Sequence, residues 1–348
     1  MTKRHRVGVW GTGNVGLRAL RTVIEHPLME LVAVRVYSDA KQGRDAGELC
    51  GVAATGVLAT QSIDAVLAAR PDCVIYLPHQ LDVDDLCRLL AAGINIATAY
   101  IGFNHRDSVD PAMREKLEAA CAQGRTSLYS TGSSPGWATE LMPLTLLAMQ
   151  RRFDCLTIFD YADMSTRNSP KMLFEGMSFG ADPKTVAHRP QGTAVSTPPT
   201  FRALAEAVGL PLDEVKTSIE FAVALKDERI AAGVIKAGTI AAKRMGVIGL
   251  RGGKPLLQRF STWYAVKETD PQWEVQSSGW RFRVEGDTSL DVSVNFAVAE
   301  QDYAEYSPGL TAHPVVNAVP FVCEAAPGIV QTSELPMFVP YFGAMPRN

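Results

Sequence analysis

The chain has 348 residues, 47% of them hydrophobic, with a formal net charge of −3 at pH 7. A chain of this length buries a substantial core and is long enough for two domains. The near balance of 34 basic and 37 acidic residues argues against a nucleic-acid partner, which requires clustered Lys and Arg. No apolar run approaches the roughly 20 residues that cross a bilayer, and the first residues lack a signal-peptide order, so we expect a cytoplasmic protein with no membrane partner.

The cysteines are too scattered to predict a metal site. Their positions are Cys50, Cys73, Cys87, Cys121, Cys155 and Cys323, with no Cys-x-x-Cys pair among them. Structural zinc sites need closely spaced Cys and His ligands. We therefore expect buried thiols and no bound metal.

From residue 6 to about residue 132, apolar β-branched runs alternate with segments of helical periodicity. This alternation is typical of an α/β fold in which helices cover both faces of a parallel sheet. The expected strands are residues 6–10, 31–37, 57–59, 73–77, 95–98 and 127–130. The expected helices are residues 15–25, 63–69, 83–92 and 111–123.

A glycine motif joins the first expected strand to the first expected helix. In "VGVWGTGNVGLRALRTVIEH", Gly11 makes a tight turn, Gly13 lets a pyrophosphate approach the backbone, and Gly16 lets the helix pack closely on the strand. The pyrophosphate then lies at the amino end of the helix. The expected contacts of a bound dinucleotide are Gly11, Thr12, Gly13, Asn14, Val15 and Gly16.

The end of the second expected strand bears on which dinucleotide binds. An Asp or Glu there typically binds the ribose hydroxyls of NAD, whereas cations and hydroxyls suit the 2′-phosphate of NADP. Ser38, Lys41 and Arg44 follow this strand and favour NADP. Asp39 leaves NAD possible, because its carboxylate would suit the ribose.

Three later strand ends lie at the same carboxyl edge, where open α/β sheets bind their ligands. Leu77, Pro78 and His79 follow one strand, and Thr98 and Ala99 end the next. We expect both groups to line the nicotinamide half of the cofactor site. The third strand end leads into the turn 130–136, which is rich in small residues. This turn either lets cofactor and substrate approach the backbone closely or simply links two domains.

After about residue 145 the chain changes to long alternating runs, which predict an α+β domain with an open mixed or antiparallel sheet. We expect strands at 155–161, 259–267, 280–284 and 289–299, helices at 199–208, 212–215 and 313–325, and a helix or loop at 235–249. The predicted domains are 1–135 for the dinucleotide, 136–310 for substrate and dimerisation, and 311–348 packing back on the first domain.

Several motifs resemble the dihydrodipicolinate-reductase-like oxidoreductases, especially 2,4-diaminopentanoate dehydrogenase and the amine dehydrogenases. The resemblance covers nearly the whole chain. It lies in the glycine motif, "GRDAGEL" at 43–49, "TGSSPGW" at 131–137, "DMSTRNSP" at 163–170 and the segment 307–336. It implies a Rossmann domain, a second domain built on an open sheet, a cleft between the two, a homodimer, and hydride transfer between NAD(P)H and an amine or imine carbon.

Two departures bear on the chemistry. Amine dehydrogenases carry an acidic pair after the fifth strand, where this chain reads Ala99-Tyr100-Ile101-Gly102, and Ser134 replaces the family asparagine of the next turn. An iminium or ammonium in a desolvated pocket needs a negative partner, so the missing glutamate weakens the case for ammonia chemistry.

Other side chains are candidates for the missing group. The candidate catalytic residues are Tyr100, His105, Asp160, Tyr161 and Asp163, although ordinary structural roles remain open for each. Strand alternation places Asp160 on one face of its strand and Tyr161 with Asp163 on the other. The candidate substrate pocket comprises Ile101, Ser134, Trp137, Met172 and Phe174, although core packing also explains apolar residues of this kind.

The sequence therefore predicts an NADP-preferring enzyme that transfers hydride to or from a C=N carbon of a small, mostly apolar substrate. The missing glutamate keeps NADPH-dependent carbonyl or alcohol chemistry as an alternative. A non-catalytic NADP-binding protein is the third possibility.

Overall fold

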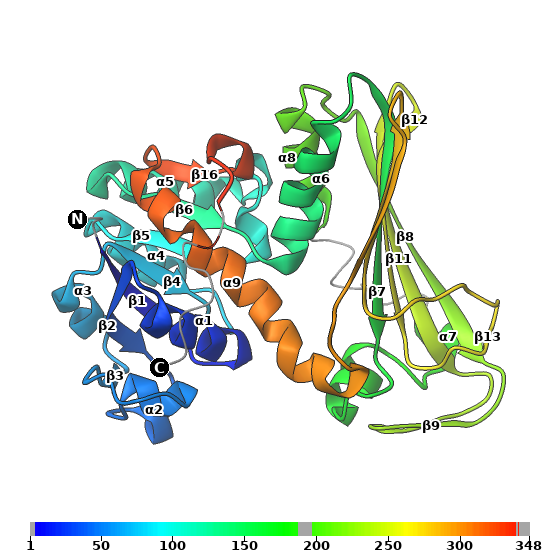
Figure 1. The fold of residues 1–348 in the computed structure, drawn as a ribbon, viewed down its shortest axis with the longest axis horizontal. Helices are drawn as coiled ribbons and strands as arrows, with labels where there is room; N and C mark the ends of the chain where they lie inside the picture. The colour runs from blue at the N-terminus through cyan, green and yellow to red at the C-terminus, as the bar shows by residue number, and fades with distance from the viewer. Residues whose placement is uncertain (1–3, 187–196, 339, 341–348) are drawn as a thin grey trace. The chain divides into compact units, whose positions relative to one another are not determined.

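The computed structural model describes residues 4–186, 197–338 and 340 (Figure 1). It divides into two compact units. The first unit consists of Met1–Leu141 together with Ser307–Asn348, and the second is Met142–Tyr306. The chain thus passes from the first unit to the second and returns, with junctions a few residues from the boundaries expected after residues 135 and 310.

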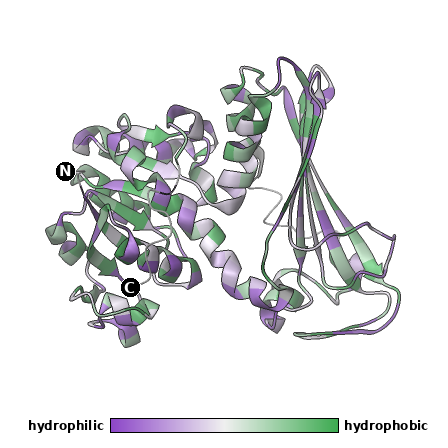
Figure 2. Cartoon of the chain, in the orientation of Figure 1, coloured by the Kyte–Doolittle hydropathy of each residue, from purple (hydrophilic) through white to green (hydrophobic). Residues whose placement is uncertain are grey.

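The first unit is built on a parallel sheet with the strand order β16-β6-β5-β4-β1-β2-β3. The predicted Rossmann-type sheet is confirmed. Its strands are mostly hydrophobic, as expected for a sheet covered on both faces (Figure 2). The strands are β1 (His5–Trp10), β2 (Met29–Arg35), β3 (Ala59–Thr60), β4 (Cys73–Tyr76), β5 (Asn95–Thr98), β6 (Ser127–Ser130) and β16 (Gly328–Val330).

Two apolar cores form because successive strand residues point to opposite faces of this sheet. Val7 and Val9 of β1 belong to one core with Leu20 of the first helix, whereas Trp10 belongs to the other with Leu89. The helices of this part of the chain are α1 (Asn14–Glu25), α2 (Ala46–Cys50), α3 (Ile63–Ala69), α4 (Val83–Ala91) and α5 (Pro111–Gly124).

The returning segment completes the first unit. Helix α9 (Tyr303–Glu324) starts earlier than the expected 313–325 and continues through Pro308, Pro314 and Pro320. Val315, Val316 and Val319 in its second half are fully buried in the core that also holds Val7 and Val9. The chain then adds β16 to the edge of the sheet beside β6, a strand that the sequence analysis did not predict.

The second unit is built on a mixed sheet, as the sequence predicted, and its strand order is β13-β8-β11-β12-β7-β14-β15. Its strands pair antiparallel except for β7 with β12. They are β7 (Phe153–Asp163), β8 (Glu214–Ala224), β11 (Ile240–Arg251), β12 (Lys254–Tyr264), β13 (Thr269–Asp270), β14 (Gly279–Gly286) and β15 (Leu290–Asn295). A small hairpin, β9 (Glu228–Ile230) with β10 (Gly233–Ile235), and helices α6 (Met142–Leu147), α7 (Pro183–Val186) and α8 (Thr197–Ala207) complete it.

Two local predictions for this unit were wrong. The helix expected at 212–215 is replaced by the start of β8, and most of the segment 235–249 forms β11 between β8 and β12. Small residues in β11 face close neighbours, since a Cβ on Gly246 would lie 2.4 Å from the Ser218 hydroxyl oxygen. These residues leave room for packing across the strand, a requirement that local sequence does not reveal.

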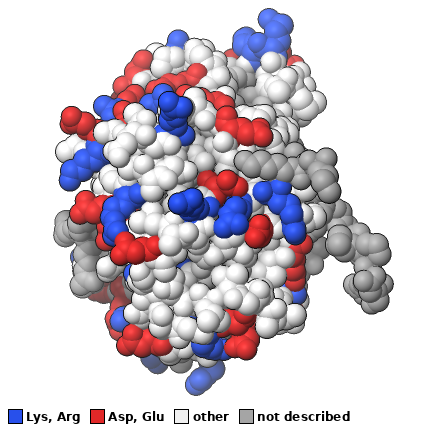
Figure 3. Space-filling model, turned by 90° about the vertical axis from the view of Figure 1, so that its left-hand side faces the viewer, with Lys and Arg blue, Asp and Glu red and all other residues white. Residues whose placement is uncertain are grey.

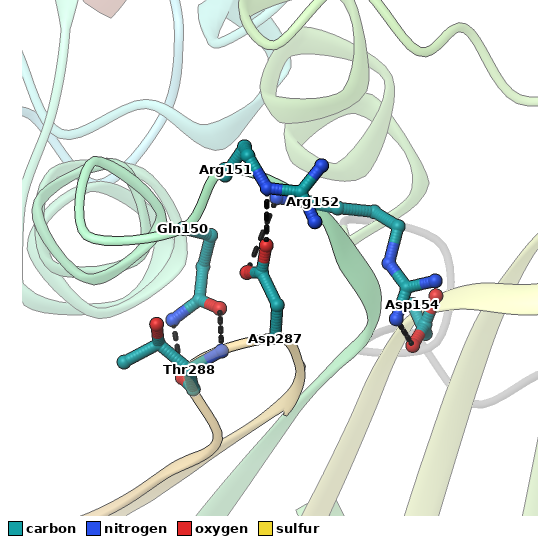
Figure 4. A network of polar contacts seen from close by, with 6 residues as sticks. All are labelled: Gln150, Arg151, Arg152, Asp154, Asp287 and Thr288. Atoms are coloured by element: carbon teal, nitrogen blue, oxygen red, sulfur yellow. Dashed lines mark hydrogen bonds and ion pairs between the residues drawn. The ribbon is translucent and has the colours of Figure 1, made fainter.

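Polar contacts fasten the β14–β15 turn to the segment before β7 (Figure 4). The Gln150 amide donates to the Thr288 carbonyl at 2.5 Å and accepts from the Thr288 backbone N–H at 3.1 Å. Arg151 pairs with Asp287 at 3.0 Å. These contacts fix one end of the sheet.

The charged surface is mixed on the face drawn in Figure 3, where basic and acidic side chains are interspersed. Among the described residues, no helix combines the length and apolar character needed to cross a membrane. Within the same residues, no group of three or more His, Cys, Asp or Glu side chains could hold a metal ion.

Candidate active site

The turn between β1 and α1 is shaped by backbone contacts that only glycine permits. Gly11 has φ +95°, and a Cβ there would lie 2.5 Å from the Leu77 carbonyl oxygen. A Cβ on Gly16 would lie 2.0 Å from the Gly11 carbonyl oxygen. Neither position accepts a side chain unless the turn opens.

Gly13 differs from these two glycines because a Cβ on it would meet no atom within 4 Å. It is the N-cap of α1, and the first turn of that helix contains no acidic residue. The free backbone N–H groups of a helix start attract anions. The open space above Gly13 therefore fits a phosphate group at the start of α1.

A cavity of about 430 Å³ lies over this turn. Its walls come from the glycine turn, from the end of β2 and from the segment after β4. The lining residues are Gly11, Thr12, Gly13, Asn14, Val15, Gly16, Tyr37, Ser38, Lys41, Leu77, Pro78 and His79. The structure thus brings together most of the residues expected to contact a dinucleotide.

A second cavity of about 300 Å³ shares Val15, Leu77 and Pro78 with the first, so the two adjoin along the carboxyl ends of the strands. Thr98 and Ala99, the other expected cofactor contacts, line this second cavity. Its remaining walls are Tyr76, Leu81, Tyr100 and Thr311. No carboxylate is among the residues that line it.

Two of the cations near the end of β2 have clear but different positions. The Lys41 ammonium donates to the Thr12 carbonyl oxygen at 2.7 Å and to the Thr12 hydroxyl at 3.2 Å, so it lies at the glycine turn. Arg44, also expected to contact the cofactor, is exposed and does not line the cavity. The Asp39 carboxylate accepts a hydrogen bond from the Gln61 amide at 2.8 Å.

Sequence analysis missed Tyr37, which is 55% exposed and lines the first cavity. Its hydroxyl accepts a hydrogen bond from the Trp10 indole N–H at 2.8 Å. The Arg35 guanidinium lies over both rings, 5.2 Å from the Trp10 centroid and 4.8 Å from the Tyr37 centroid. These contacts give the first cavity an aromatic wall beside a cation.

Tyr100 and His105, two of the catalytic candidates, have different surroundings. Tyr100 is 42% exposed at the second cavity, and its ring packs against Phe103 at 4.9 Å between centroids. His105 is buried and lines neither cavity, and its Nδ1 lies 3.3 Å from the Ser108 hydroxyl. Ile101 begins the short 3-10 turn after Tyr100 and lines neither cavity.

The candidates on β7 belong to the second unit. Asp160 forms an ion pair with Arg259 at 2.8 Å and accepts from the Ser261 hydroxyl at 3.3 Å. Tyr161 projects to the opposite face, and burial raises the pKa of its hydroxyl. Asp163 is buried and accepts from the Ser165 backbone N–H at 2.9 Å, which caps the turn after β7 and is an ordinary structural role.

The remaining substrate-pocket candidates are divided between the units. Ser134 and Trp137 lie in the segment Ser133–Leu141 of the first unit, in which the backbone of Ser134 is extended and not helical. The Trp137 backbone N–H donates to the Gly132 carbonyl at 2.8 Å. Met172 is 37% exposed, whereas Phe174 packs against an apolar core of the second unit.

A buried carboxyl in the first unit was also missed. Glu140 is 2% exposed, and its carboxyl accepts hydrogen bonds from Asn104 at 3.2 Å and from the Thr332 hydroxyl. Burial raises its pKa to about 8, although the two hydrogen bonds act in the opposite direction. A single Glu within the apolar stretch "WATELMPL" was the available signal.

Two family models match this chain, one near each end. Residues 5–121 match the family model for the dihydrodipicolinate reductase N-terminus, and residues 191–347 match that for the 2,4-diaminopentanoate dehydrogenase C-terminal domain. An amine dehydrogenase of Streptomyces virginiae is 31% identical over 346 residues, covering 94% of this chain and 95% of the relative.

Solved structures share the fold. An amine dehydrogenase from Mycobacterium smegmatis aligns with a TM-score of 0.75 at 18% identity, covering 96% of this chain and 97% of the other. A probable dehydrogenase from Thermotoga maritima aligns with a TM-score of 0.58 at 14% identity, covering 94% and 91%. At these identities the structural matches establish the fold alone. The sequence identity to the curated relative establishes more, and this chain belongs to the amine dehydrogenase family of dihydrodipicolinate-reductase-like, NAD(P)-dependent oxidoreductases.

Proposed function

We propose that this protein is an NADP-preferring oxidoreductase that transfers hydride to or from the C=N carbon of a small, mostly apolar amine or imine. The observation that carries the proposal is the pair of adjoining cavities in the first unit, one over the glycine turn and one with largely apolar walls. The first has the shape and chemistry for a dinucleotide phosphate. The second can receive a reactive ring and a small substrate beside it.

The chain's own residues would hold and orient the cofactor, which when bound supplies the hydride chemistry. The turn from Gly11 to Gly16 would hold the pyrophosphate through backbone N–H groups. Val15, Leu77, Pro78, Thr98 and Ala99 would line the nicotinamide half, with His79 at the rim of the phosphate half. A mainly apolar wall excludes water from the reacting carbon.

The preference for NADP is supported by the side chains at the end of β2. Lys41 and Ser38 line the first cavity, and the Lys41 ammonium is already positioned at the glycine turn. The nearby carboxylate of Asp39 is engaged by Gln61. A cation and a hydroxyl suit a 2′-phosphate, and a carboxylate at the same point would repel it.

Tyr100 is our candidate for handling the proton. Its side chain lines the second cavity and is exposed, whereas His105 is buried away from both cavities and Asp163 caps a turn. A tyrosine hydroxyl can both donate and accept a hydrogen bond, so it can hold an amine or a developing alkoxide. The role of Asp160, which forms an ion pair with Arg259 within the second unit, stays a prediction of the sequence analysis.

A second candidate function is reduction of a carbonyl or oxidation of an alcohol. The absence of a carboxylate from the walls of the second cavity favours it, because neutral substrates need no negative partner there.

The family resemblance also predicts a homodimer. Light scattering of the purified protein tests that assembly, and a mass of one chain would contradict it.

Replacing Gly13 with Val should abolish NADPH binding and leave the protein folded, because the new side chain occupies the open space over the start of α1. Gly16→Ala serves as the contrast, since its Cβ meets the Gly11 carbonyl and should lower the unfolding midpoint. Calorimetric titration and thermal unfolding measure both effects. Unchanged NADPH affinity in Gly13→Val would refute the proposed phosphate site.

Lys41→Ala should weaken NADPH binding by roughly tenfold or more, as expected for loss of a charge-assisted hydrogen bond worth about 1.5–3 kcal/mol. NADH affinity should change much less, because NADH lacks the 2′-phosphate. Arg44→Ala removes the same charge from a residue outside the cavity and is the matched control. Equal losses for NADH and NADPH in Lys41→Ala would contradict the proposed specificity.

A substrate screen separates the two candidate reactions. We expect the wild-type protein with NADP⁺ to oxidise small apolar primary amines, and with NADPH to reduce the matching ketones only when ammonium is present. Tyr100→Phe should lower kcat by roughly a hundredfold if its hydroxyl handles the proton. Ketone reduction that is independent of ammonium would favour the carbonyl function instead.

A further inference from the structure

The buried carboxyl of Glu140 connects three segments of the first unit. Glu140 lies in the segment Ser133–Leu141 after β6. Its Oε1 accepts from the Asn104 amide at 3.2 Å, and its Oε2 accepts from the Thr332 hydroxyl. The hydroxyls of Thr332 and Tyr129 lie 3.0 Å apart. Segments distant in sequence therefore meet at one buried acid.

A chain of hydrogen bonds leads from this acid to the second cavity. The Asn104 amide that contacts Glu140 also donates to the Ser130 carbonyl at 3.3 Å. The Ser130 hydroxyl in turn donates to the Tyr100 carbonyl at 2.7 Å. The Tyr100 N–H donates to the Thr98 hydroxyl at 3.1 Å, so the backbone at Tyr100 is held on both sides.

Glu140 itself lines neither cavity, so it is not placed to touch cofactor or substrate. Glu140 can therefore affect the second cavity only through the residues to which it is hydrogen-bonded. We propose that Glu140 is a positioning residue, which acts through Asn104 and Ser130 to fix Tyr100 at the wall of the second cavity. This inference rests on the proposed function, because it assigns Tyr100 to the reaction site.

The hydrogen-bond partners agree with an uncharged acid. Asn104 and Thr332 are both neutral, and Tyr129 is the titratable group that faces the carboxyl from β6. Among the described residues, no charged side chain contributes to its pKa shift. An isolated carboxylate, which accepts from both partners, would be costly here. A protonated Oε2 would instead donate to the Thr332 hydroxyl oxygen, reversing that one contact, while Oε1 still accepts from Asn104.

The pH dependence follows from the direction of the pKa shift. The pKa of Glu140 is raised from 4.5 to about 8 in the folded protein, so the folded state binds the proton more tightly than the unfolded state. The stabilisation is complete below pH 4.5 and is lost as the pH rises to about 8. Above that pH the buried carboxylate would be charged and desolvated, so the free energy of unfolding of the first unit would fall and the segment that holds Tyr100 would be less stable.

Glu140→Gln and Glu140→Ala test the proposal. Gln keeps an acceptor for Asn104 and a donor for Thr332 but cannot ionise, so it should retain kcat/KM at neutral pH and remove the alkaline loss of activity near pH 8. Ala breaks the chain and should lower kcat/KM by roughly tenfold to a hundredfold through misplacement of Tyr100. NADPH affinity should stay unchanged in both variants, and the exposed Glu48→Gln is the matched control.

Two measurements stay informative without an identified substrate. Hydrogen exchange should speed up in residues 98–104 of Glu140→Ala and remain slow in Glu140→Gln. Between pH 5 and pH 8, the unfolding midpoint of the wild type should fall further than that of Glu140→Gln. If Glu140→Ala does not fold, Thr332→Val removes one contact and should increase exchange in the same peptide.

The inference is overturned if exchange in residues 98–104 does not respond to loss of the Glu140 contacts. It is also overturned if Glu140→Gln keeps the alkaline profile of the wild type. Failure of the proposed function gives a different result. The wild-type protein would then bind neither NADPH nor NADP⁺, or would oxidise no amine. The exchange and unfolding measurements would still decide the role of Glu140.

Discussion

The close backbone contacts of the first crossover fix the shape of the proposed cofactor site. Gly11 turns with a positive φ against the carbonyl after β4, and Gly16 lets α1 lie directly on that turn. A side chain at either position would push helix and strand apart. The contacts thus point the start of α1 at the carboxyl edge of the sheet, where both cavities lie.

Structural features that depend on a local residue pattern could be predicted from the sequence. The parallel sheet follows from uninterrupted apolar runs alternating with helical periodicity, and the cofactor turn follows from glycines whose spacing has a distinct mechanical purpose. In the second unit, β8 and β11 were missed. Their small and charged residues pack against neighbouring strands, so tertiary contacts outweigh local preference. The strand β16 is too short to give a period.

Only the parts of the proposed site that the backbone forms, the glycine turn and the strand ends, could be predicted from the sequence. The glycine turn and the strand ends take their places from chain order, but side-chain direction depends on partners elsewhere. Arg44 does not line the cavity, whereas the Lys41 ammonium reaches Thr12. Tyr37 forms a wall because Trp10 and Arg35 hold it. The buried position of Glu140 depends on Thr332, which is nearly two hundred residues away in the chain.

The most direct test is calorimetric titration of the purified wild-type protein with NADPH and, separately, with NADH. The account predicts saturable binding of one NADPH per chain, with NADH binding more weakly. No heat of binding from either coenzyme, in protein shown to be folded, would contradict the assignment of the glycine turn as the cofactor site.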